Sequence, residues 1–259
     1  MRCHLAASDP DRVPLVAVAS PGAFLKEAVA GPKAPVEKPA AGRKFVLFCS
    51  TIEIRKNHIL LLKVWHRLRP VLGDRLPTLV FCGRWGWMYD ELVAFMAAHP
   101  ELHEHVEFRS NLTDEQLADL YQGAEFSVYP STVEGWGLGA AECLDFGLPV
   151  LISDAPSLTE ATQGLMPTIP AHDVEAWCAA VAEACTNPAW LAELREKIAS
   201  QYRPILEQEF FATIVDHVPA LGSSDPGHRI RWSKPLATGT RQRPAEFATE
   251  EPAFRQVDL

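Results

Sequence analysis

The chain has 259 residues, of which 47% are hydrophobic, and a formal net charge of −9 at pH 7. This length and composition predict a soluble globular chain of one domain or slightly more. The acidic balance argues against non-specific nucleic-acid binding, which needs a basic face. No apolar run approaches the ~20 residues that a membrane-spanning helix requires.

The two ends of the chain differ in composition from its middle. Residues 15–19 favour a strand, and the proline-rich residues 31–42 are typical of a linker or surface loop. Residues 222–259 are polar, rich in Pro and Gly, and without periodicity, which predicts a disordered tail. We therefore predict a remnant of an N-terminal region with a linker over residues 1–42, one main domain over residues 43–221, and the tail over residues 222–259.

Short apolar segments alternate with amphipathic ones throughout the main domain. Strands are predicted at residues 45–49, 78–82, 106–109, 125–129, 149–153 and near 168–169. Helices are predicted at residues 59–72, 89–98, 113–123, 138–146, 173–185 and 189–205, with a capping box between Thr113 and Gln116. This alternation predicts an α/β fold, a Rossmann-like parallel sheet flanked by helices. Ligands of such sheets bind at the carboxyl ends of the strands.

The stretch from residue 130 to residue 153, PSTVEGWGLGAAECLDFGLPVLIS, carries the main functional signal. It places Glu134 and a turn containing Gly135 and Gly137 between a strand and a helix. The first amides of a helix have no internal acceptor, and the helix dipole is positive there, so this layout favours an anion. The two glycines permit a positive φ and the close approach of a ligand to the backbone.

Two carboxylates flank the predicted anion site. Glu142 lies eight positions after Glu134, which corresponds to about 12 Å along a helix. A glycosidase pair needs its carboxyl groups roughly 5–9.5 Å apart, so this spacing favours a different use. Carboxylates accept hydrogen bonds from sugar hydroxyls, and a phosphate between two polyols describes a nucleotide sugar. The alternative is a glycine-rich turn with two solvated acids.

Residues 130–160 resemble the donor-site signature of family-4 retaining glycosyltransferases, which have the GT-B fold. The resemblance rests on the EGWGL turn, the second Glu eight positions later, the GLPV strand entry and the SLTE segment at residues 157–160. Ser157 also fits a helix cap with Glu160 in capping-box register. The resemblance implies a donor site formed by Glu134, Gly135, Trp136, Gly137, Leu138 and Glu142.

A basic pair, Arg55 and Lys56, follows the first predicted strand. Cations aimed at a departing diphosphate stabilise the charge that develops there, so we expect neither a metal nor a cofactor. The segment resembles the basic donor loop of the same family, although Thr51 stands where many members have an arginine. Arg55 would then supply that charge, and the alternative is a basic pair that only closes a loop. For the next loop, packing of Trp85 and Trp87 is favoured over contact of Arg84 with phosphate.

The resemblance implies transfer of a sugar, with retention, from GDP-mannose or a UDP-sugar to a glycan or lipid-linked acceptor in surface polysaccharide synthesis. Glu134, Arg55 and Lys56 would act in catalysis, with Glu134 on the sugar and Glu142 on the ribose. The family's acceptor-binding domain is not recognisable in residues 1–42, so the alternative is a truncated, non-catalytic nucleotide-sugar-binding fragment whose N-terminal domain is missing.

Two further expectations concern location and metals. The N-terminal residues lack the apolar core of a signal peptide, and no Cys-x-x-Cys pair is present. We therefore expect a cytoplasmic protein with at most peripheral contact at the inner face of the membrane. His99, His103 and His105 are expected to form a solvated cluster rather than a metal site.

Overall fold

A computed structural model describes residues 19–29 and 42–222 of the chain. The described residues fall into two compact units, one with residues 22–29 and 42–204 and the other with residues 19–21 and 205–222. Of the predicted N-terminal remnant, residues 19–29 and 42 are described, and the rest lies outside the described residues, together with most of the strand predicted at 15–19. All of the predicted tail except Gly222 also lies outside them. Within the described ranges, no helix combines the length and the apolar character needed to cross a bilayer.

The larger unit is built on a six-stranded parallel sheet in the order β3-β2-β1-β4-β5-β6. Its strands are β1 (Phe45–Cys49), β2 (Thr78–Cys82), β3 (Val106–Arg109), β4 (Phe126–Tyr129), β5 (Val150–Ser153) and β6 (Thr168–Ile169). Strand order reverses between β1 and β4, and such a switch point opens a crevice at the carboxyl ends of the strands. The predicted fold class is confirmed.

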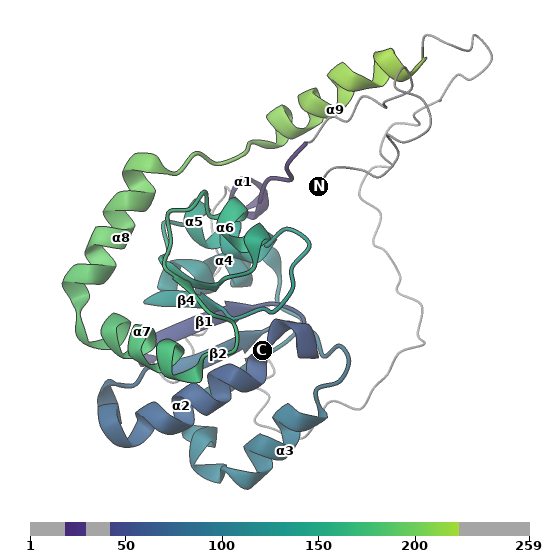
Figure 1. The fold of residues 1–259 in the computed structure, drawn as a ribbon. Helices are drawn as coiled ribbons and strands as arrows, with labels where there is room; N and C mark the ends of the chain where they lie inside the picture. Colours follow the sequence, from purple (N-terminus) through teal and green to yellow (C-terminus); the bar gives the residue numbers. More distant parts are fainter. Residues whose placement is uncertain (1–18, 30–41, 223–259) are drawn as a thin grey trace, which may run out of the picture. The chain divides into compact units, whose positions relative to one another are not determined.

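Helices cover both faces of the sheet (Figure 1). They are α1 (Leu25–Ala28), α2 (His58–Leu72), α3 (Asp90–Ala98), α4 (Asp114–Gly123), α5 (Leu138–Asp145), α6 (Pro156–Ala161), α7 (Val174–Thr186) and α8 (Pro188–Gln201). Three 3-10 turns complete the unit, namely η4 (Ile54–Lys56), η5 (Gly73–Arg75) and η6 (Pro100–Glu104). Helices α2, α3 and α7 lie on one face of the sheet, and α4 and α5 lie on the other (Figure 1). Because both faces are covered, the central strands are buried apolar runs.

Most predicted elements have the expected bounds, and the capping box of α4 is confirmed. The Thr113 hydroxyl accepts from the Gln116 amide at 3.3 Å, and the Gln116 side chain accepts from the Thr113 amide at 2.8 Å. The predicted cap at Ser157 is wrong. Helix α6 begins at Pro156, with Ala155 as its N-cap, because proline has no N–H and suits the first helical position.

The helix predicted over residues 189–205 ends earlier, at Gln201. Pro204 explains this end, because a proline lacks the N–H that would continue the helix and disfavours helical geometry in the residue before it. A helix that the pattern analysis missed follows in the smaller unit, α9 (Glu207–Gly222). Its exposed apolar side chains include Phe211, Ile214 and Val215.

Candidate functional site

The loops that leave β1 and β4 are tied together at the carboxyl edge of the sheet. The Thr132 amide donates to the Arg55 carbonyl at 2.9 Å, and the Thr132 hydroxyl donates to the same oxygen at 3.1 Å. The Asn57 side-chain amide donates to the carbonyls of Pro130 and Ala171 at 3.2 and 2.8 Å. These bonds fix the η4 turn beside the loop after β4, and so bring the predicted basic pair to the predicted acidic turn.

The centre of this rim is an ion pair between Lys56 and Glu134. Lys56 Nζ lies 2.6 Å from both carboxylate oxygens of Glu134, and the Ser131 hydroxyl donates to Glu134 Oε1 at 2.8 Å. Only 12% of the Lys56 side chain and 6% of the Glu134 side chain are exposed. The lysine cation is therefore held at one position at the carboxyl edge of the sheet, in a partly buried ion pair with Glu134.

Arg55 is the more open of the two cations. Its guanidinium NH1 lies 3.8 Å from Glu134 Oε2, and its Nε forms an ion pair with Glu53 Oε1. Glu53 is buried, and its Oε1 has no hydrogen bond of good geometry within the described part of the chain, so Arg55 is its counter-charge. The sequence analysis missed Glu53, although an acid two positions before a basic pair is a visible signal.

The glycine turn leads directly into α5. Gly137 is the N-cap of the helix, with φ of 105°, and a Cβ there would lie 2.8 Å from Leu158 Cδ2. Gly135 differs from the prediction, because its φ is not positive and no described atom lies within 4 Å of the place that its Cβ would take. Gly139, which the prediction left out, packs against Tyr129. The crowded glycines are therefore Gly137, the N-cap of α5, and Gly139, in the first turn of α5.

Glu142 lies in α5 and pairs with a tyrosine of α4. Tyr121 donates its hydroxyl hydrogen to Glu142 Oε2 at 2.7 Å, and its ring stacks on Phe146 at 5.3 Å. Burial raises the pKa of the Glu142 carboxyl, the Tyr121 hydrogen bond lowers it, and Asp145 and Asp114 raise it further. Burial also raises the pKa of Tyr121 well above its usual value, so the phenol stays a donor. Tyr121 was not predicted, because only the packing of α4 on the sheet brings it to α5.

Of the two remaining residues of the predicted donor site, Trp136 packs against other side chains and Leu138 is exposed. The Trp136 side chain packs against Ala23, Ala141 and Ala161, and its buried indole Nε1 has no hydrogen-bond partner among the described residues. Leu138, the first residue of α5, is 47% exposed at the rim.

The loop after β2 shows a mixture of packing and exposure. Trp85 stacks on Phe108 at 5.2 Å, which confirms the predicted packing. Trp87 is 59% exposed, so packing was the wrong interpretation there. Arg84 is also exposed, and it is therefore accessible to an anion.

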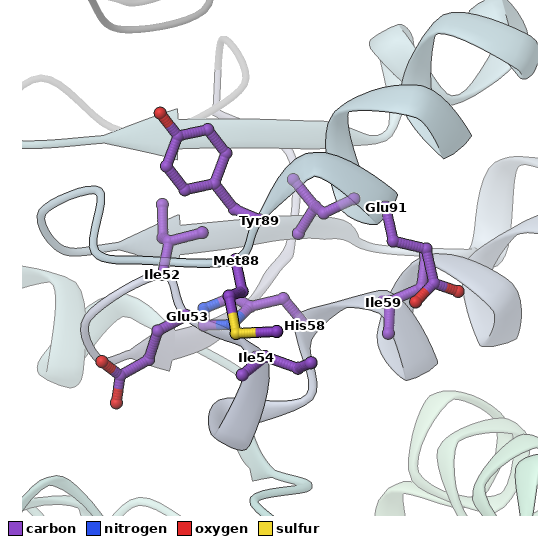
Figure 2. A pocket seen from close by; sticks show the side chains of 9 residues that line it. Ile52, Glu53, Ile54, His58, Ile59, Met88, Tyr89 and Glu91 are labelled. Atoms are coloured by element: carbon purple, nitrogen blue, oxygen red, sulfur yellow. The ribbon is translucent and has the colours of Figure 1, made fainter. Parts of the chain in front are cut away.

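A separate small pocket lies beside the η4 turn (Figure 2). It is lined mainly by apolar side chains, together with Glu53, His58 and Glu91. His58 is buried against Phe48 and Phe81, with ring centroids 4.5 and 4.9 Å apart. Burial, and then the charge of Lys56, lowers the pKa of His58 to about 3. The imidazole is therefore neutral at physiological pH and supports the first turn of α2 by packing.

Together, the fold and the charges define a Rossmann-like α/β domain with two cations, Arg55 and Lys56, beside its switch point. The family described as "Glycosyl transferases group 1" matches residues 33–203, which is more than half of the chain. The chain therefore belongs to this glycosyltransferase family.

The curated relatives include proteins named as mannosyltransferases. The serotype-specific mannosyltransferase WbdA of Escherichia coli is 33% identical over 147 residues, which cover 54% of this chain and 18% of WbdA. The O-antigen chain mannosyltransferase B of Escherichia coli is 29% identical over 58% of this chain and 39% of its own. A D-inositol 3-phosphate glycosyltransferase of Thermobispora bispora is 30% identical over 71% of this chain and 45% of its own. The chain thus spans less than half the length of these relatives.

Solved structures of GT-B glycosyltransferases share the fold. The sucrose-phosphate synthase from Thermosynechococcus elongatus matches 79% of this chain and 50% of its own, with a TM-score of 0.56 and 20% identity. A structure of S. aureus TarM, solved in a complex that includes UDP, matches 71% of this chain and 37% of its own, with a TM-score of 0.54 and 16% identity. At these identities the likeness shows the fold alone.

We expect the affinity for a nucleotide sugar to fall on acidification as Glu142 takes up a proton. A carboxylate is the better acceptor for a ribose hydroxyl, and the pKa of Glu142 is raised, so the loss begins at a higher pH than for an ordinary glutamate. Titration calorimetry with GDP-mannose at a series of pH values measures this, because the diphosphate diester does not itself titrate there. The Glu142→Gln variant serves as the control and is expected to show a flat profile. Identical dependence of affinity on pH in the two proteins would contradict a hydrogen bond from the ribose to Glu142.

Proposed function

We propose that this domain binds the nucleotide-sugar donor of a family-4-type retaining glycosyltransferase that transfers mannose during surface polysaccharide synthesis. The observation that carries the proposal is the Lys56 cation, held by Glu134 between the ends of β1 and β4 and beside the N-terminus of α5. The curated relatives named as O-antigen mannosyltransferases support a mannosyl donor, and hence GDP-mannose.

The diphosphate of the donor fits the cationic side of the rim. Lys56 and Arg55 provide two positive charges there, and the first amides of α5 add unpaired donors at the positive end of a helix dipole. Such groups stabilise the charge that grows on a departing nucleoside diphosphate. They supply this stabilisation without a metal ion, and we expect no metal requirement for donor binding.

The two carboxylates, Glu134 and Glu142, accept hydrogen bonds from the two sugar rings of the donor. When the diphosphate shares Lys56, Glu134 is released to accept a hydrogen bond from a hydroxyl of the transferred sugar. Glu142 keeps the Tyr121 hydroxyl on Oε2 and uses its other oxygen for the ribose. Donor binding thus exchanges one partner of Lys56 for another. Glu134 pairs with Lys56 in the absence of the donor, and the diphosphate pairs with it in the complex.

Titration calorimetry with UDP, GDP and ADP tests the proposal and identifies the base. We expect micromolar binding of GDP and a loss of roughly tenfold or more in Glu142→Ala, since a hydrogen bond to a charged group contributes about 1.5–3 kcal/mol. The matched control is Glu175→Ala, which removes an exposed glutamate on α7 that pairs with Arg67. Failure of a folded chain to bind any of the three nucleotides would overturn the proposal.

A second candidate function is nucleotide-sugar binding without turnover. Its support is that both carboxylates of the rim are engaged, Glu134 by Lys56 and Glu142 by Tyr121, which leaves neither as a free general base. A transfer assay with GDP-mannose and a mannoside acceptor separates the two candidates. A new mannosidic bond with the α-configuration of the donor supports the retaining enzyme, and nucleotide binding with no product supports the binding module.

A further inference from the structure

A cluster of His66, His99 and Glu101 lies at the edge of the sheet opposite the donor rim. His66 is in the second half of α2, His99 is the C-cap of α3, and Glu101 is in η6, which leads into the start of β3. The sequence analysis grouped His99 with His103 and His105 as solvated residues. The structure instead pairs His99 with a histidine from another helix, and we call the three residues the His–Glu cluster.

The distances within the His–Glu cluster are close to those between the ligand atoms of a metal ion. Nδ1 of His66 lies 3.1 Å from Glu101 Oε1, and Nδ1 of His99 lies 3.2 Å from the same oxygen. Each of the three residues offers a ligand atom, and these atoms all lie within 4.8 Å of one another. Tetrahedral zinc with bonds of about 2.0–2.1 Å separates its ligand atoms by about 3.3–3.4 Å. Each pair of ligand atoms is therefore at most about 1.4 Å too far apart for zinc.

The rings are held in position by packing before any ion binds. The two imidazole centroids are 4.2 Å apart, and Phe95 contacts both rings, at 6.0 Å from His66 and 4.3 Å from His99. The His99 amide donates to the carbonyls of Phe95 and Met96, and Pro100 begins η6, so the backbone on both sides of His99 is restrained. Preorganised ligands of this kind lose little entropy on binding.

The His–Glu cluster is partly open to solvent. Between 28% and 41% of each side chain is exposed, which leaves room for water to complete the coordination. Each neutral imidazole can coordinate a metal ion through one ring nitrogen while the other nitrogen carries the proton.

We propose that His66, His99 and Glu101 form a binding site for a divalent transition-metal ion, with zinc as the best fit. Two imidazoles and one carboxylate suit zinc and its neighbours in the first transition row, whereas magnesium and calcium prefer all-oxygen sites. A bound ion would link α2 to the turn between α3 and η6. The site is structural and independent of the donor rim.

Titration of the full chain with zinc chloride tests the proposal, with calorimetry as the readout. We expect one equivalent to bind, with a rise in the unfolding temperature, because a ligand of the native state stabilises it by mass action. Removing a residue that only hydrogen-bonds to a metal ligand lowers metal affinity about 10–100-fold. His99→Gln and Glu101→Gln remove a ligand itself, so each should lower zinc affinity by at least that factor. Magnesium chloride is expected not to bind.

The controls keep this result specific to the His–Glu cluster. His172→Gln changes an exposed histidine outside the cluster and should leave zinc affinity unchanged. Cobalt(II) provides a second readout, since three protein ligands and a water in a tetrahedral field give intense visible absorption that free cobalt lacks. The proposal would be overturned if His99→Gln and Glu101→Gln changed neither the zinc affinity nor the cobalt spectrum. It would also be overturned if the folded wild-type chain bound no zinc.

Discussion

Replacing Lys56 with methionine is expected to lower the free energy of unfolding by about 3 kcal/mol, because it leaves a buried charge without its partner. The Glu134 carboxylate lies 2.6 Å from Lys56 Nζ through both oxygens, and its side chain is almost completely buried. Ser131 and the more distant Arg55 do not replace the lost cation. Urea denaturation of the wild-type and variant chains measures the difference.

A double-variant cycle separates the stability of this pair from its use in donor binding. We expect Glu134→Gln to restore most of the stability lost in Lys56→Met, because the buried charge is gone. Nucleotide binding should remain at least tenfold weaker in the double variant, since the cation that meets the diphosphate is absent. A double variant that binds nucleotide as well as the wild type would contradict the assignment of Lys56 to the diphosphate.

The matched control for this cycle is Lys63→Met. Lys63 pairs with Glu91 at 3.2 Å, but both side chains are well exposed. An exposed pair contributes about 0–1 kcal/mol, so this variant should unfold close to the wild-type midpoint. A loss equal to that of Lys56→Met would mean that burial does not distinguish the two pairs.

Substitution of Gly139 by alanine is expected to destabilise the chain by about 3 kcal/mol, at the upper end of the usual cost of overpacking. A Cβ at this position would lie 2.1 Å from the hydroxyl oxygen of Tyr129 and 3.1 Å from the Cys49 carbonyl. Tyr129 is buried and donates to that carbonyl at 2.9 Å. The buried ring has no free space to move into, and the hydrogen bond from Tyr129 to the Cys49 carbonyl is lost.

Gly135→Ala, in the glycine turn that precedes α5, is the matched comparison. No described atom lies within 4 Å of its added Cβ, so we expect an unfolding midpoint within experimental error of the wild type. If the donor approaches the backbone at Gly135, the added methyl group lowers nucleotide affinity without any loss of stability. Thermal unfolding and calorimetry of the two variants measure both effects. Equal stability losses at Gly135 and Gly139 would show that the crowding at Gly139 is not the cause.

The sequence alone determined the order and type of the strands and of the long helices between them. The apolar segments at β1, β2 and β3 are short and bounded by polar loops, and the helix signals between them are local, as in the capping box of α4. Local signals fail where two of them compete. Pro204 ended α8 within a stretch whose apolar spacing continued the helix, and Pro156 displaced the predicted cap at Ser157.

The sequence also determined which residues reach the rim. Parallel strands bring every loop that follows a strand to one edge, so Arg55, Lys56 and Glu134 could be placed together before any coordinate was known. The family signature added Glu142 at its fixed spacing within α5. These inferences need only the direction of the chain and the residues that follow each strand.

Only the tertiary structure decided which side chains meet. The pairing of Lys56 with Glu134, of Tyr121 with Glu142 and of His66 with His99 joins residues that are far apart in the chain. Such contacts depend on the angle and depth at which helices pack on the sheet, and a sequence pattern does not contain these quantities. The same packing determines which glycine position has room for a side chain, since it leaves space around Gly135 and none at Gly139.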